Sequence, residues 1–152
     1  MKRVPLASAS EAGGVRLTPL ILFTCWLASG ALLEVLLAFK ARPYVENDLR
    51  REMWTLAHAH GALLALAWFA IGSIVHARLG ESRLCMMGDR LFGIGAILVP
   101  MGFLLGGAWH PESDPGIGVL LTPVGAACCV SGLVLWILAL RRDQVPRADS
   151  GA

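Results

Sequence analysis

Residues 56–75 read LAHAHGALLALAWFAIGSIV, a run of twenty residues without a single Asp, Glu, Lys or Arg. A bilayer core about 30 Å thick is crossed by roughly 20 apolar residues in an α-helix. Three further stretches are similarly apolar, so we predict four membrane spans: 20–39, 56–75, 91–107 and 117–140. The sequence therefore predicts an all-α integral membrane protein.

Composition supports the same class. Of the 152 residues, 56% are hydrophobic and only 16% are charged, against about 25% charged in an ordinary soluble domain. Buried helices of a soluble protein would carry polar faces, which these runs lack. A net charge of +2 is too small to indicate a nucleic-acid partner. The lipid bilayer is the partner that the composition predicts.

The connections between the spans are short, and they predict an up-down four-transmembrane-helix bundle. We expect one membrane domain over residues 1–152, with mobile tails at 1–17 and 143–152. Asn47 or Asp48 can cap the second helix. Gly102 and Gly106 form a GxxxG motif, which permits close approach between helices and would also permit a homo-oligomer.

Tryptophans and cysteines carry weaker expectations. Trp54, Trp109 and Trp136 suit anchoring at the membrane interface, whereas the other two tryptophans suit internal packing. The four cysteines form neither a CxxC motif nor a disulfide framework. We place Cys85 in the loop between the second and third spans.

Lys and Arg favour the cytoplasmic side of a membrane. With both termini in the cytoplasm, nine of these residues lie inside and four outside. The four outside residues all belong to the first loop, and they oppose this orientation. We nevertheless predict cytoplasmic N- and C-termini.

Ionisable residues within membrane spans are costly and therefore functional candidates. Glu34 lies about five residues before the outer end of the first span, or roughly 7 to 8 Å deep. His58 and His60 lie in the first turns of the second span, and His110 follows the third. The topology gathers these four side chains into one layer near the outer surface.

Imidazole and carboxylate groups together suit zinc, copper, iron or heme iron. The sequence thus predicts a metal site from Glu34, His58, His60 and His110. The two neighbouring histidines are about 200° apart around a helix, so one of them faces away from any common site. Two alternatives stay open: the histidines only tie helices together, or Glu34 serves proton-coupled transport.

The segment Ala57-His58-Ala59-His60-Gly61-Ala62-Leu63-Leu64 resembles the H-x-H-x-x-L-L helix of heme–copper oxidase subunit I and related proteins. That resemblance implies that His58 or His60 is an axial ligand of heme iron or a copper ligand. The chain also resembles a group of small four-helix bacterial membrane proteins with no assigned activity. The matching segments are A-H-A-H-G at 57–61, PMGFLLGG at 100–107, DPG at 114–116 and PVGA at 123–126.

These observations lead to one expected function and two alternatives. We expect a bacterial inner-membrane protein with a periplasmic-side His/Glu site that binds heme or a transition metal, or one that is accessory to a respiratory complex. The alternatives are a non-catalytic structural or assembly subunit and a small proton-coupled transporter using Glu34. An enzyme is disfavoured, because we find no nucleophile–base pair, phosphate-binding glycine loop or redox dithiol in the sequence.

Overall fold

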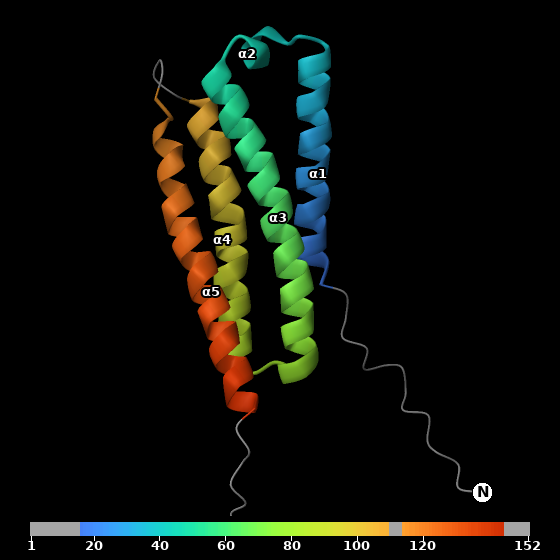
Figure 1. Cartoon of the computed structure of the whole chain (residues 1–152), viewed down its shortest axis with the longest axis vertical. Helices are drawn as coiled ribbons and strands as arrows, with labels where there is room; N and C mark the ends of the chain where they lie inside the picture. The colour runs from blue at the N-terminus through green and yellow to red at the C-terminus, as the bar shows by residue number, and fades with distance from the viewer. Residues whose placement is uncertain (1–15, 110–113, 145–152) are drawn as a thin grey trace, which may run out of the picture.

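The computed structural model describes residues 16–109 and 114–144. Its elements are α1 (Leu17–Ala38), α2 (Arg42–Val45), α3 (Asp48–Leu79), α4 (Arg83–Ala108), the 3₁₀ helix η2 (Ile117–Leu120) and α5 (Leu121–Asp143). The four long helices run up and down side by side (Figure 1). Each is long and apolar enough to cross a membrane. The predicted all-α, four-helix membrane fold is confirmed.

The second of the four long helices, α3, extends well beyond the predicted span 56–75 at both ends. α3 has 32 residues, which is about 48 Å at 1.5 Å per residue and exceeds the bilayer core of about 30 Å. Its first turn is capped by Asn47, whose Oδ1 accepts a hydrogen bond of 2.8 Å from the Arg50 backbone N–H. The predicted cap is confirmed, and a polar first turn explains why hydropathy alone places the helix start too late.

The remaining helix ends correct two further expectations. α4 begins at Arg83 behind the cap residue Ser82, so Cys85 is a buried helix residue and not part of a loop. α1 begins at Leu17, and Arg16 forms an ion pair with Asp89. The end of the predicted N-terminal tail is therefore ordered. Residues 1–15 and 145–152 of the predicted tails lie outside the described residues.

Glycines form the contact between α4 and α5 along its whole length. A Cβ at Gly95 would overlap the Gly125 carbonyl oxygen and the Cys129 sulfur, and one at Gly132 would lie 2.8 Å from the Gly88 carbonyl oxygen. The two glycines of the GxxxG motif face Thr122 and Val119. The close helix approach predicted from that motif is confirmed.

Trp136 lies in the core that these helices enclose. Its ring stacks on Phe92 with 5.3 Å between centroids, and its Nε1–H donates a 3.2 Å hydrogen bond to the Cys85 carbonyl. Only 1% of the residue is exposed. The expectation that Trp136 anchors at the interface is therefore wrong, because the glycine at position 88 opens space for its indole ring.

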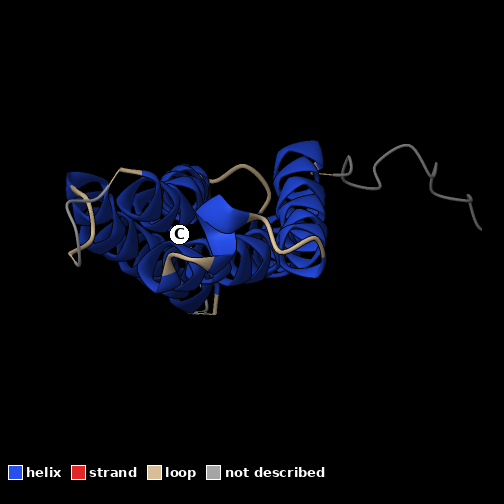
Figure 2. Ribbon diagram, turned by 90° about the horizontal axis from the view of Figure 1, so that it is seen from above, coloured by secondary structure: helices blue, strands red, loops and turns tan. Residues whose placement is uncertain are grey.

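α1 is the most exposed of the four long helices. The most apolar stretch of 18 residues in α1 contains no buried residue. The helix packs mainly against α3, where Trp26 lies on Gly61 and His58 lies on Gly30. Seen from above, the helices form an elongated row rather than a square (Figure 2). The seam between α1 and α3 is consequently open to the surroundings along its flank.

Candidate functional site: a pocket between α1 and α3

A pocket of about 290 Å³ lies on the flank of the α1–α3 seam, beside α2. It combines an apolar wall with a carboxylate, an imidazole and two hydroxyl groups. Its lining residues are Leu27, Gly30, Ala31, Leu33, Glu34, Leu37, Tyr44, Thr55 and His58. Two of the residues predicted from sequence, Glu34 and His58, thus line one pocket.

The imidazole of His58 is held by α1. Its Nδ1 lies 2.7 Å from the Trp26 carbonyl oxygen, and since a carbonyl only accepts, Nδ1 carries the proton. Gly30 makes the approach possible, because a Cβ at this position would overlap the ring. In the neutral ring, Nε2 is then an acceptor, and no described residue forms a hydrogen bond with it.

Glu34 lies one helical turn beyond Gly30, on the same face of α1. Its side chain is exposed, and no hydrogen bond or ion pair to it occurs among the described residues. Thr55 supplies a further polar group, but its hydroxyl proton is already donated to the Arg51 carbonyl at 2.7 Å. The pocket therefore presents several hydrogen-bond acceptors and one unpaired carboxylate.

His60 faces a different part of the molecule. Its Nδ1 lies 2.9 Å from the Leu56 carbonyl oxygen of its own helix, and its ring lies 5.0 Å from that of Phe103 on α4. Because it does not line the pocket, the structure brings Glu34 and His58 together without His60. Among the described residues no group of three His, Cys, Asp or Glu side chains is placed to hold a metal ion. His110 lies outside the described residues.

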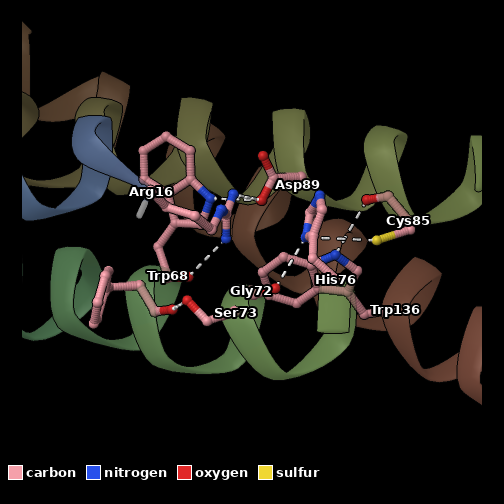
Figure 3. Close-up of polar contacts among 9 residues, drawn as sticks. Arg16, Trp68, Gly72, Ser73, His76, Cys85, Asp89 and Trp136 are labelled. Atoms are coloured by element: carbon pink, nitrogen blue, oxygen red, sulfur yellow. Dashed lines mark hydrogen bonds and ion pairs between the residues drawn. The ribbon is translucent and has the colours of Figure 1, made fainter. Parts of the chain in front are cut away.

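A second polar cluster, at the opposite end of the long helices, was not anticipated from the sequence. Arg16 forms an ion pair with Asp89, and Asp89 also accepts a 2.9 Å hydrogen bond from the Trp68 indole N–H (Figure 3). Arg16 donates to the Trp68 carbonyl at 3.2 Å as well. Gly72 provides the space, since a Cβ there would overlap the guanidinium group.

The same region holds a thiol beside an imidazole. Cys85 Sγ lies 3.7 Å from His76 Nδ1, which also lies 2.9 Å from the Gly72 carbonyl oxygen (Figure 3). This pair could not be predicted from the sequence, because His76 lies on α3 and Cys85 on α4. Cys85 is 0% exposed, so its sulfur is inaccessible to a substrate in this conformation and the pair contributes to packing.

Asp89 could have been found from the sequence by one signal. Ser82 is a good helix N-cap, and the residues that follow it up to Arg90 are compatible with a helix. This signal starts the third membrane helix, α4, before residue 91 and includes Asp89 in it. Placing the start of the span at residue 91 left this carboxylate in the loop. Its partner Arg16 lay in the predicted tail and carried no such signal.

Searches of known protein families, curated proteins and solved structures found no match to this chain. The geometry of its own residues is therefore the basis for inferring its function.

Proposed function

We propose that this chain is a multi-pass protein of the bacterial inner membrane that binds a small ligand or cofactor in the pocket between α1 and α3. The observation that carries this proposal is the shared pocket of Glu34 and His58, formed by residues from three elements. A few polar groups on an apolar wall, here an unpaired carboxylate, an imidazole and two hydroxyls, are the usual composition of a binding site. Apolar packing alone does not require either group.

Heme or a transition metal is the first ligand class to test. A histidine whose Nδ1–H is held by a backbone carbonyl presents Nε2 to a metal in a fixed orientation, and His58 has this arrangement. A bare ion needs more donors than Glu34 and His58 alone provide. Heme iron brings four ring nitrogens of its own, so one axial histidine suffices. With a pocket of about 290 Å³, most of the porphyrin would lie outside it, against α1 and α3.

Three other roles make different predictions. An accessory subunit of a respiratory complex would copurify with that complex. A structural or assembly subunit, alone or as a homo-oligomer, would bind no ligand. A proton-coupled transporter would lose transport when Glu34 is replaced by Gln. The pocket favours a binding role over a structural one, because Glu34 has no ion pair within the described part of the chain that would hold helices together.

The test compares two histidines that lie two residues apart on α3 but face different surroundings. The protein is purified in mild detergent as wild type, His58→Ala and His60→Ala. Each sample is examined by oxidised and reduced absorption spectra, metal analysis and mass spectrometry of extracted small molecules. We expect a copurified ligand in wild type and His60→Ala that is absent from His58→Ala. A Soret band would identify heme, and a stoichiometric metal without that band would identify a bare ion.

Two outcomes would contradict the proposal. One is a ligand-free wild type that takes up nothing when heme, metal ions or lipid extract are supplied. The other is equal loss of ligand from both histidine variants, which would indicate a general effect on folding. A thermal unfolding curve for each variant separates loss of binding from loss of structure.

A further inference from the structure

Every polar group of the pocket whose hydrogen bonds are fixed by the structure is an acceptor. In its neutral form His58 donates through Nδ1 to the Trp26 carbonyl, which leaves Nε2 as an acceptor. Thr55 donates its only hydroxyl proton to Arg51, which leaves its oxygen lone pairs free to accept. A carboxylate such as that of Glu34 only accepts. Because the Tyr44 hydroxyl is the only group among the described lining residues with a proton left to donate, a ligand with several hydrogen-bond donors fits this pocket best.

The charge of the pocket adds a second requirement. Among the described residues, Glu34 is the one acidic residue of the lining, and no Lys or Arg lines the pocket with it. Described ion pairs at the same end of the molecule join other residues, Arg42 with Glu46 and Arg51 with Asp48. A carboxylate in an apolar lining is stabilised by a cation. The ligand is therefore expected to be positively charged.

The apolar part of the lining indicates how such a ligand arrives. Leu27 and Leu37 are 49% and 48% exposed, and both belong to a helix that crosses the membrane with an uncovered outer surface. The pocket wall is thus continuous with surface that meets the lipid chains. A ligand with an apolar body can enter sideways from the bilayer, with its polar group at the level of Glu34.

We infer that the pocket binds a lipophilic primary amine in its protonated form. An ammonium group carries three donors, and Glu34, His58 and Thr55 each contribute an acceptor to the residues that line the pocket. Its positive charge pairs with Glu34, and its apolar body lies along Leu27, Ala31 and Leu37. The volume of about 290 Å³ is near the lower limit for small-molecule pockets, so it suits a single-ring or short-chain amine. This inference rests on the proposed ligand-binding role of the same pocket.

The experiment measures binding of 4-phenylbutylamine to the full-length protein in nanodiscs of uncharged lipid, by isothermal titration against empty nanodiscs. The corresponding alcohol, 4-phenylbutanol, has the same apolar body without the charge. We expect the amine to bind at least tenfold more tightly than the alcohol. Glu34→Gln should remove that preference, because it keeps the side-chain size and deletes the charge. Glu46→Gln, which changes an exposed carboxylate on the loop, should leave the preference unchanged.

The failure of this inference can be distinguished from failure of the proposed function. Equal binding of amine and alcohol that His58→Ala abolishes and His60→Ala preserves would overturn the amine while leaving a ligand pocket in place. Tighter binding of a neutral hydroquinone than of the amine would overturn it in the same way. No binding of any probe, in a protein that unfolds cooperatively, would overturn both.

Discussion

Asp89 accepts two contacts from different parts of the chain. The carboxylate pairs with Arg16 ahead of α1 and accepts from Trp68 of α3, while its own backbone belongs to α4. The side chains of Arg16 and Asp89 are 16% and 20% exposed, so water screens the pair only in part. An ion pair of this kind contributes little compared with an apolar replacement, but losing one partner leaves a costly unpaired charge.

We therefore predict that Asp89→Ala lowers the free energy of unfolding by about 3 kcal/mol, the lower limit for breaking a buried pair. The free energy of unfolding of Asp89→Asn should lie between those of Asp89→Ala and wild type, because the amide oxygen can still accept the hydrogen bond from the Trp68 indole N–H. Arg42→Ala is the control, since Arg42 and Glu46 are 87% and 70% exposed and such pairs contribute little. Unfolding by SDS in mixed micelles measures all three. Equal stability of Asp89→Ala and Arg42→Ala would contradict the prediction.

Of the four site residues that the sequence predicted, the structure places two, Glu34 and His58, in one pocket. Helical geometry alone indicated that His58 and His60 face different directions, and the structure shows which of the two meets α1. The sequence could not identify His58, because the choice depends on the space above Gly30, and this space exists only after α1 and α3 have packed. Asp89 was missed for another reason, because starting the span at residue 91 left its carboxylate in a loop, whereas α4 begins at Arg83.

Among the elements, α4 and α5 form the most tightly packed pair, and their contact depends on residues without side chains. At Gly95 a Cβ would meet the Gly125 carbonyl and the Cys129 backbone N, which cannot move without moving the helix. At Gly106 the nearest atom would be Val119 Cβ, at 3.3 Å. Extra atoms in a close contact cost about 1 to 3 kcal/mol when the neighbours cannot adjust.

Gly95→Ala should accordingly destabilise the protein by about 2 kcal/mol, and Gly106→Ala should have a clearly smaller effect. Both variants gain the same helix propensity, so the difference between them reports the α4–α5 contact. The measurement is the midpoint of thermal unfolding in detergent, followed by circular dichroism. Equal midpoints would show that α5 can move away from α4 at little cost.

The elements themselves were largely predictable, and the errors have a common cause. Apolar length located all four helices, and the GxxxG motif indicated one of the close contacts correctly. The predicted cap at Asn47 or Asp48 located the start of α3 correctly. Hydropathy placed the start of α4 eight residues too late, because the charged residues Arg83, Asp89 and Arg90 lower the hydropathy of its first turns. Hydrogen-bonded caps at Asn47 and Ser82 determine those starts, and a hydropathy window does not register caps.

For the whole molecule, four membrane crossings determine that both ends of the described chain lie on the same side. α1 begins and α5 ends at the same end of the long helices (Figure 1). Glu34 near the end of α1 and His58 in the first third of α3 place the pocket towards the other end. Both ends of the described chain therefore lie on one side of the membrane. Among the described residues, six Lys and Arg residues lie at this end of the long helices, against four at the opposite end, and this excess indicates the side.

We predict that this side is the cytoplasm. A fluorescent protein fused after Ala152 should then fluoresce in bacterial cells, and alkaline phosphatase at the same position should be inactive. Phe39 is 82% exposed between α1 and α2, so Phe39→Cys should react in intact cells with a thiol reagent that does not cross the membrane. Wild type is the control, because Cys25 lies on α1 within the bilayer. The reverse result would turn the pocket towards the cytoplasm, and its ligand would then have to come from inside the cell.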